Sequence, residues 1–263
     1  IDPIDKLSEL ALKHDIGLHV DGCLGGFILP WGEQLGYDIP PIDFRVPGVT
    51  SISADTHKYA YGPKGTSVVV YRDKGFRKHQ YTTNPEWVGG TYVSPGIGGS
   101  RSGGIMAATW AVMVTLGKEG YKERARKIFE TAFTMQKSVT RHPELRLMGS
   151  PTFCFSFTSD EFDIYHLNDF MKERGWRFNG QQYPSAIHMC VTGPQTQPGL
   201  AEEFDKDLAE AVAYAKNPAH SIAKSGALYG GQGSKSMIEH NDMEMIRDIM
   251  IEYQDDCLEQ PDD

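Results

Sequence analysis

A short predicted strand that is followed by a His-Lys pair constrains this 263-residue chain more than any other feature. Residues 49–54 have the apolar, β-branched composition of a strand, and His57 and Lys58 come just after it. A second predicted strand, residues 16–20, ends on Asp21. Ligands of parallel sheets bind at the carboxyl ends of the strands. A lysine and a carboxylate at such ends therefore predict a ligand site.

The order of patterns along the chain predicts an α/β protein in two parts. The first part alternates predicted helices, strands and glycine-rich loops, and the second follows an αββαββα order that describes a small α+β domain. We expect residues 1–135 to form the first part. We expect residues 136–263 to be the small domain, with a frayed acidic tail. A chain that starts one helix before its first strand is expected to be a piece of a longer polypeptide.

Periodicity and composition give the individual elements. The predicted helices are residues 1–14, 105–116, 121–140, 163–174 and 200–215. The predicted strands are residues 16–21, 49–54, 65–71, 145–148, 153–158, 176–178 and 187–192. Residues 82–104 are rich in glycine, serine and proline and predict a long loop. Apolar side chains expected in the core include Val68, Val69, Val70, Met106, Trp110 and the phenylalanines of the second part.

Composition excludes several kinds of partner and ligand. The net charge of -9 argues against nucleic-acid binding, which needs a basic face. The four scattered cysteines, Cys23, Cys154, Cys190 and Cys257, indicate reduced thiols in a reducing compartment. The histidines show no spacing typical of metal ligands, so we expect no metal site. No apolar run reaches the roughly 18 residues that a membrane-spanning helix needs.

Lys58 and Asp21 together have the chemistry that pyridoxal phosphate (PLP) requires. A lysine that attacks an aldehyde must be deprotonated, and we expect burial beside cations such as His57 and Lys64 to lower the pKa of Lys58. The pyridine ring must stay protonated to act as an electron sink, and a carboxylate such as Asp21 holds that proton. Taken alone, either residue could be an ordinary surface lysine or a capping aspartate.

The glycine-rich run at residues 96–104 has the composition of a phosphate-binding loop. Small residues expose backbone N–H groups, Ser100 adds a hydroxyl, Arg101 adds a planar cation, and the following helix turns its positive end toward them. A plain connector is the alternative for such a run.

Three further residues are candidates for a place in or near the site. His57 could donate to a cofactor phosphate or have a purely structural role. Tyr229 lies in a glycine-rich segment and could fold over the site as an acid or base, or pack on the surface as a loop aromatic. His19 precedes Asp21 by two residues, so both side chains point to one face of the strand, either as partners or with His19 as a core histidine.

Two motifs resemble the sphingosine-1-phosphate lyase family. These are residues 19–27 (His-Val-Asp-Gly-Cys-Leu-Gly-Gly-Phe) and residues 44–59, which end in Ser-Ala-Asp-Thr-His-Lys-Tyr. Residues 65–67, 99–104, 162–165 and the Tyr229 segment extend the resemblance over nearly the whole chain. That family belongs to the PLP-dependent group II decarboxylases with the aspartate-aminotransferase fold. The resemblance implies that this chain holds the back half of the PLP-binding large domain and the small domain.

The resemblance also implies roles for individual residues. Lys58 would link covalently to PLP, and Asp21 would pair with the pyridine nitrogen. His57 and Ser100 would hold the cofactor phosphate, while Lys64 and Tyr229 would lie near the reacting end of the substrate. In the family the site forms at a homodimer interface, so the glycine-rich loop could serve the partner's cofactor. The roles of His19, Arg101 and Cys23 stay open.

The implied reaction is retro-aldol cleavage of a phosphorylated sphingoid base to a long-chain aldehyde and phosphoethanolamine. The family's early phosphate loop and its ring-stacking histidine would lie upstream of Asp21, in a half that this chain lacks. The alternatives are an amino-acid decarboxylase of the same superfamily and a non-catalytic assembly subunit. The resemblance implies a cytoplasmic location for a soluble form, and the endoplasmic reticulum membrane where an upstream anchor exists.

Overall fold

The computed structural model describes residues 1–226, 247–248 and 250–252. It divides into two compact units, Ile1–Lys127 and Ile128–Asp263, each of which is described by itself. This division and the expected boundary near residue 135 both fall within helix α4 (Gly103–Thr140).

The first unit contains a three-stranded sheet in the order β1-β2-β3. Strands β1 and β2 are parallel, and β3 is antiparallel to β2. The bounds of its elements are α1 (Ile4–Lys13), β1 (Leu18–Asp21), α2 (Leu29–Gln34), β2 (Val49–Ala54), β3 (Val68–Tyr71), α3 (Lys74–Arg77), the 3₁₀ helix η1 (Lys78–Gln80), β4 (Thr82–Asn84) and β5 (Tyr92–Ser94). The first expected helix and the three expected strands are therefore present: β2 has the predicted bounds, and α1, β1 and β3 are shorter than predicted.

Side-chain alternation gives this sheet one apolar and one polar face. Helix α1 packs against β1, and a buried cluster of Ile4, Val20, Val46 and Val49 fills the apolar side. Because successive side chains of a strand point to opposite faces, His19 and Asp21 project from the other side. The polar face is thus the one available for a ligand.

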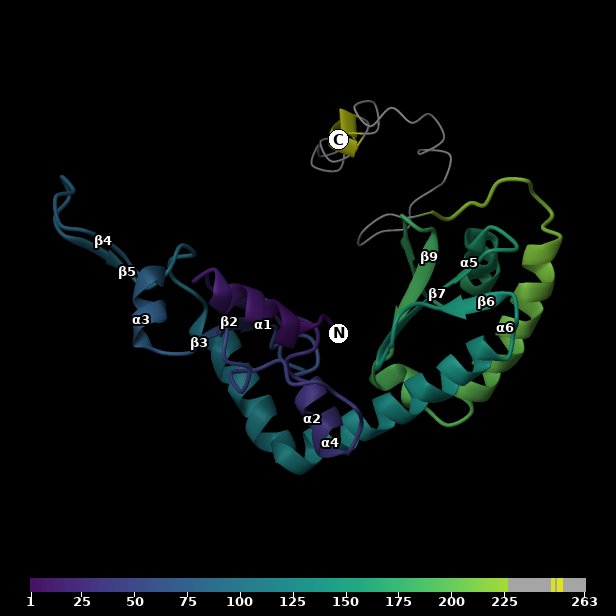
Figure 1. Ribbon diagram of the computed structural model, residues 1–263, viewed down its shortest axis with the longest axis horizontal. Coiled ribbons are helices and arrows are strands. Elements are labelled where there is room, and N and C mark those ends of the chain that lie inside the picture. Colours follow the sequence, from purple (N-terminus) through teal and green to yellow (C-terminus); the bar gives the residue numbers. More distant parts are fainter. Residues whose placement is uncertain (227–246, 249, 253–263) are drawn as a thin grey trace, which may run out of the picture. The chain divides into compact units, whose positions relative to one another are not determined.

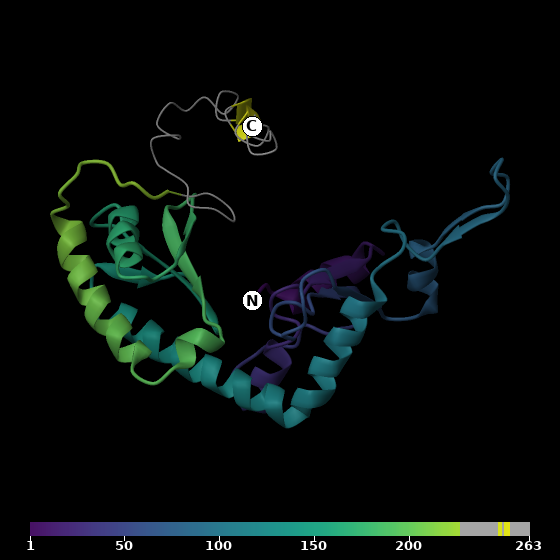
Figure 2. The ribbon, with the colours of Figure 1, turned by 180° about the vertical axis from the view of Figure 1, so that it is seen from behind.

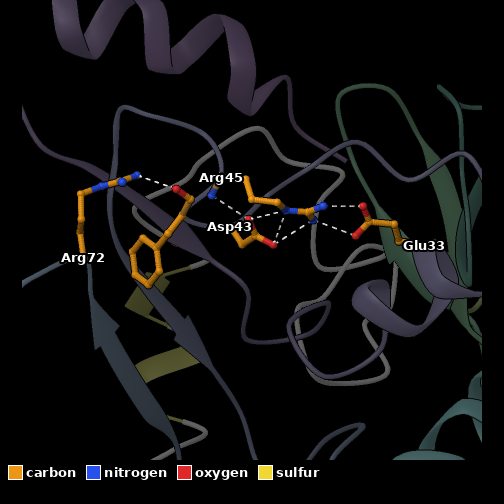
Figure 3. A network of polar contacts seen from close by, with 5 residues as sticks. Glu33, Asp43, Arg45 and Arg72 are labelled. Carbon is orange, nitrogen blue, oxygen red and sulfur yellow. Dashed lines mark hydrogen bonds and ion pairs between the residues drawn. The ribbon is translucent and has the colours of Figure 1, made fainter.

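Two arginines fix the connection between α2 and β2. Arg45 donates to both carboxylate oxygens of Glu33 at 2.6 and 2.7 Å, and its Nε donates to Asp43 at 2.9 Å (Figure 3). Arg72, from just after β3, donates to the carbonyl oxygens of Val46 at 2.7 Å and Val49 at 2.6 Å. These contacts hold the start of β2 and so determine where its carboxyl end emerges.

The prediction of one long loop over residues 82–104 is wrong in its first half. Strands β4 and β5 pair there as an antiparallel hairpin, with Thr83 opposite Val93, and the hairpin extends away from α3 (Figure 2). The rings of Trp87 and Tyr92 meet edge to face at 5.9 Å. Three-residue strands separated by proline and glycine leave too short an alternation to be detected in a sequence.

Two predictions of burial are also wrong for the described chain. Met106 and Trp110 were expected in the core, but they are 51% and 67% exposed, one turn apart on α4. The valines of β3 were expected in a buried sheet, and they are 40–48% exposed. The expected interruption at Gly117 is present, because its φ of 56° breaks the helical geometry of α4.

The second unit is a four-stranded antiparallel sheet in the order β6-β7-β9-β8. Its elements are β6 (Leu145–Leu147), β7 (Cys154–Ser159), α5 (Ile164–Glu173), β8 (Asn179–Gln181), β9 (Ala186–Cys190), the 3₁₀ helix η2 (Gly193–Thr196) and α6 (Leu200–Lys216). Helices α5 and α6 lie side by side over one face of the sheet (Figure 1). The expected αββαββα order is confirmed.

The alternating phenylalanines of β7 form the core of this unit as expected. Phe155 and Phe157 are fully buried, and Phe178 meets Phe157 edge to face at 5.6 Å. The predicted strand at residues 176–178 is wrong, because β8 begins three residues later. Trp176 instead enters the core, where its Nε1 donates to Asp207 at 2.8 Å. In neither unit does a described helix combine the length and the apolar character that crossing a membrane requires.

Candidate functional site

Parallel pairing of β1 with β2 places Asp21 opposite Ser53 on the polar face. The Asp21 carboxylate accepts a hydrogen bond from Ser53 Oγ at 3.1 Å and from the backbone N–H of Cys23 at 3.0 Å. His19 lies within hydrogen-bond distance of Ser51 Oγ (2.8 Å) and of Ser53 Oγ (3.1 Å). His19 is exposed and bound to serines, so it belongs to the polar face and not to the core.

These donors keep Asp21 ionised. The backbone N–H of Cys23, its side chain and Ser53 together outweigh the opposing effect of burial and hold the pKa of Asp21 below its ordinary value. Hydrogen bonds to a carboxylate favour its charged form. Asp21 is therefore a carboxylate at neutral pH, as a partner for a protonated ring nitrogen must be.

Lys58 lies in the turn that follows β2, with its amine held from two sides. Its Nζ is 2.9 Å from Oδ2 of Asp55 and 3.2 Å from Sγ of Cys23. Burial acts to lower the pKa of Lys58, but the hydrogen bonds with Asp55 and Cys23 outweigh it and raise the pKa. The expectation that neighbouring cations lower this pKa is wrong, because the nearest charged group is a carboxylate.

Cys23 touches both key groups of the site. Its backbone N–H binds Asp21, and its Sγ contacts the amine of Lys58, 35 residues away in sequence. Its carbonyl oxygen accepts the backbone N–H of Asp55 at 3.2 Å. The loop after β1 and the turn after β2 are thus joined through one residue, which places the carboxylate and the amine at the same end of the sheet.

Asp55 organises the turn around Lys58. In addition to binding Lys58, its carboxylate accepts a short hydrogen bond from Ser67 Oγ and lies 3.8 Å from Nε2 of His57. Burial acts to raise the pKa of Asp55, but the hydrogen bonds from Ser67 and Lys58 outweigh it and lower the pKa. Asp55 is therefore a charged and largely covered anchor for the lysine.

The contacts of His57 determine which ring nitrogen can face a ligand. Nδ1 lies 3.0 Å from the carbonyl oxygen of Thr66, an atom that can only accept. Nδ1 must therefore carry a proton, and Nε2 is left as an acceptor in the neutral ring or a donor in the charged ring. Only the charged ring could donate to a phosphate through Nε2.

The segment after Lys58 is anchored to α4. Thr56 Oγ1 donates to the carbonyl oxygen of Thr66 at 2.8 Å, and Thr66 Oγ1 lies 3.2 Å from Oγ1 of the buried Thr109. A side chain on Gly62 would meet Thr109 Oγ1 at 2.8 Å, so the turn needs glycine there. The Tyr121 hydroxyl donates to the carbonyl of Ala60 at 2.8 Å. The backbone that carries Lys58 is therefore held at several points.

The remaining predicted site residues are not brought to this cluster. Lys64 is exposed in the turn before β3, and Ser100 is exposed in the loop before α4. Arg101 turns back on its own loop and donates to the carbonyl of Ser100 at 3.3 Å. In the described part of the chain, no hydrogen bond or ion pair joins Lys64 or Ser100 to Lys58. Tyr229 lies outside the described residues.

The donor set fits a pyridoxal phosphate group. Asp21 is an ionised carboxylate able to accept from a ring N–H, and Lys58 is a primary amine joined to it through Cys23. The same residues are not arranged for a metal ion, since residues 1–226 and the described residues of 247–252 contain no group of three or more metal-ligating side chains.

Sequence reasoning missed Asp55 and Cys23 as members of the site. A signal for Asp55 was present, since a carboxylate three residues before a lysine in a turn is well placed to bind its amine. No signal existed for Cys23, whose contact with Lys58 depends on the register of two strands.

Comparisons with known proteins agree with this geometry. Residues 1–157 match the family profile described as the pyridoxal-dependent decarboxylase conserved domain. A sphingosine-1-phosphate lyase of Oryza sativa subsp. japonica is 46% identical over 257 residues, which cover 97% of this chain and 46% of that protein. The chain thus spans about half the length of the curated relatives it matches. The similarity extends the resemblance of the motifs over nearly the whole chain.

Solved structures confirm the expected α/β fold. The structure of a sphingosine-1-phosphate lyase from Burkholderia pseudomallei matches with a TM-score of 0.80 and 67% sequence identity, covering 82% of this chain and 49% of that one. A glutamate decarboxylase from Lactobacillus brevis matches with a TM-score of 0.66 at 22% identity, covering 84% of this chain and 53% of that one. At this identity the second match supports the fold and nothing further.

Proposed function

The chain belongs to the pyridoxal-dependent decarboxylase family, and from this membership we propose that it supplies the lysine-bearing half of the active site of a sphingosine-1-phosphate lyase. The observation that carries the proposal is the position of Cys23 between the Asp21 carboxylate and the Lys58 amine. The substrate would be a phosphorylated sphingoid base, cleaved by retro-aldol chemistry to a long-chain aldehyde and phosphoethanolamine.

Each residue of the cluster has a distinct task in this proposal. When bound, pyridoxal 5'-phosphate supplies the electron sink for the pair released from the breaking carbon–carbon bond. Asp21 keeps the ring nitrogen protonated, because its own pKa is held low by Cys23 and Ser53. Lys58 would hold the cofactor through its side-chain amine. Asp55 forms an ion pair with the protonated Lys58 amine, at 2.9 Å.

The phosphate and substrate contacts are proposed from the family resemblance. His57 in its charged form would donate Nε2–H to the cofactor phosphate, since Nδ1 is engaged with Thr66. Ser100 would add a hydroxyl donor to a cofactor phosphate, either in its own subunit or in a partner's. Lys64 and Tyr229 would act at the reacting end of the substrate, as proton donors or phosphate ligands.

Residues outside this chain would complete the site. The chain spans about half of its relatives, and in the described residues β1 and β3 are the edges of the sheet. The valines of β3 are 40–48% exposed, which is unusual for three consecutive apolar residues of a strand. We propose that the other half of the family's fold covers this surface, and that a homodimer partner contributes to the site. In this proposal the units Ile1–Lys127 and Ile128–Asp263 are the back half of the cofactor domain and the small domain.

Borohydride reduction of the protein as isolated tests the role of Lys58. Reduction followed by peptide mapping should place a covalent pyridoxyl adduct on Lys58. A Lys58→Ala variant should lose the adduct and the visible absorbance of the bound cofactor, whereas Lys172→Arg, an exposed lysine of α5, should retain both. An adduct on another lysine, or none in the native protein, would overturn the proposal.

Product analysis distinguishes the lyase from an amino-acid decarboxylase of the same fold. The relatives at 46% and 67% identity are lyases, whereas the decarboxylase structure is 22% identical, so we expect cleavage of the sphingoid base. Incubation with sphingosine 1-phosphate should release a long-chain aldehyde. Carbon dioxide from an amino acid with no aldehyde would support the decarboxylase. Absence of both products and of bound cofactor would indicate a non-catalytic assembly subunit.

A further inference from the structure

Two cysteines face each other across the sheet of the second unit. Cys154 is the first residue of β7 and Cys190 is the last residue of β9, and the antiparallel register places them directly opposite one another. The Sγ atom of Cys190 lies 3.3 Å from that of Cys154. Both side chains are half-buried. A pair of thiols this close has no task in the chemistry proposed around Lys58.

The hydrogen-bond pattern of the ladder shows that this is the closer of the two kinds of cross-strand pair. Antiparallel ladders alternate between pairs that exchange backbone hydrogen bonds and pairs that do not. Val191 donates its N–H to the carbonyl of Phe153 at 3.1 Å, so the adjacent pair, Cys154 and Cys190, is of the second kind. In such pairs the Cα atoms are about 4.5 Å apart, which lies within the range that a disulfide spans.

We propose that Cys154 and Cys190 form a redox-active dithiol that a small soluble disulfide, such as glutathione disulfide, converts to an intramolecular disulfide between β7 and β9. One cysteine, as its thiolate, attacks a sulfur of glutathione disulfide, and one glutathione leaves as a thiol. The other cysteine then attacks the mixed disulfide and releases the second glutathione. Two protein thiols lose two protons and two electrons, and glutathione disulfide gains them.

The surroundings of the pair predict how the reaction responds to pH. The hydrogen bond with Cys190 and burial raise the pKa of the Cys154 thiol. Because the thiolate is the nucleophile, exchange that begins at Cys154 should be slow at neutral pH and should accelerate as the pH rises.

The disulfide would close a ring that contains α5 and β8, since both lie between the two cysteines in sequence. A cross-link of this kind restricts the unfolded chain, and native geometry needs little change because the sulfur atoms already face each other. We expect the oxidised protein to unfold at a midpoint higher by about 5 °C or more.

Peptide mapping of the protein as isolated tests the proposal. The native protein is incubated with excess glutathione disulfide at mildly alkaline pH, remaining thiols are alkylated, and the digest is analysed without reduction. The expected result is one peptide pair joining Cys154 to Cys190, an intact mass lower by about 2 Da, and reversal by dithiothreitol. Alkylation of both cysteines, or a stable glutathione adduct on each, would overturn the proposal.

Single variants separate ring closure from simple reactivity. In Cys154→Ser the second step is blocked, so Cys190 should accumulate as its glutathione adduct, with a mass gain of about 305 Da. A Cys23→Ser variant should still form the Cys154–Cys190 link, because Cys23 contacts Lys58 and lies in the first unit. A link that depends on Cys23 would contradict the assignment. The mapping of the unsubstituted protein decides the matter even if a variant fails to fold.

Discussion

The Nζ atom of Lys58 lies 2.9 Å from Oδ2 of Asp55, and these two residues are one turn apart at the end of β2. Both side chains are largely covered, at 33% and 17% exposure. Their attraction raises the pKa of Lys58 and lowers that of Asp55, although burial acts against both shifts. The amine proposed to attach the cofactor is therefore kept protonated and in place.

The first prediction concerns the replacement Asp55→Asn. An amine must lose its proton before it attacks a carbonyl, and the raised pKa of Lys58 delays that loss as the pH rises. Without the Asp55 carboxylate the pKa of Lys58 falls, so covalent loading with pyridoxal phosphate should occur at lower pH than in the unsubstituted protein. The measurement is the pH dependence of the visible absorbance band during loading.

A control for this experiment is Asp43→Asn, which removes a carboxylate from a different ion pair, that with Arg45. Its loading profile should match that of the unsubstituted protein. A profile for Asp55→Asn that stays in place, or that moves to higher pH, would contradict the assigned role of Asp55.

The second prediction is that Asp21→Asn lowers kcat/KM by about 10²-fold or more, because a neutral amide cannot stabilise a protonated ring nitrogen. Side-chain shape is retained, and the hydrogen bond from Ser53 can still be accepted. Steady-state kinetics at saturating cofactor measure the effect. Asp5→Asn, an exposed residue of α1, should leave kcat/KM unchanged. Full activity of Asp21→Asn would remove Asp21 from the site.

The third prediction concerns pH and the hydrogen bond from Ser53 to Asp21. The pKa of Asp21 is lowered, so its charge is present at neutral pH and is lost only as the pH falls through that low value. Ser53→Ala removes one of the donors that lower the pKa. The acid limb of the pH profile of kcat/KM should therefore move to higher pH.

The matched control is Ser51→Ala. Ser51 is also within hydrogen-bond distance of His19, but it does not bind the Asp21 carboxylate. The acid limb of its pH profile should coincide with that of the unsubstituted protein. The substrate's own phosphate titrates equally in both measurements, so it does not affect the comparison. Equal shifts for the two variants would show that the effect comes from the strand and not from Asp21.

The fourth prediction concerns the stability of the second unit. Asp207 is buried on α6 and accepts from Arg174 at 2.7 Å and from Trp176 Nε1 at 2.8 Å. Asp207→Ala leaves the buried indole N–H of Trp176 without its acceptor, whereas Arg174 keeps its ion pair with Glu210, so the loss should cost about 2 kcal/mol of unfolding free energy. Denaturant unfolding followed by tryptophan fluorescence measures it.

Asp205→Ala provides the comparison from the same helix. Asp205 pairs with Arg141, but the two side chains are 38% and 60% exposed. An exposed pair contributes little, so its loss should change stability by less than about 1 kcal/mol. If Asp205→Ala and Asp207→Ala lowered the unfolding free energy by similar amounts, burial would not be the reason why Asp207 contributes more.

Elements with a strong local signal could be predicted from the sequence. Helices α1, α5 and α6 and strands β2 and β7 follow from apolar periodicity, and the alternation of Phe155 and Phe157 identified the core face of β7. The hairpin of β4 and β5 could not be predicted, because three-residue strands carry too little alternation. The exposure of Trp110 could not be predicted either, since an apolar residue on a helix does not say what will cover it.

The sequence by itself determined that Asp21 ends one strand of an α/β protein and that Lys58 follows another, because a strand and its end are local properties of the chain. Only the tertiary structure decided what surrounds the Lys58 amine. The parallel register of β1 and β2 brings Cys23 to it across 35 residues, and the turn after β2 turns Asp55 toward it. Contacts of this kind depend on how distant segments pair. Because of them the pKa of Lys58 is raised, whereas the sequence predicted that it would be lowered.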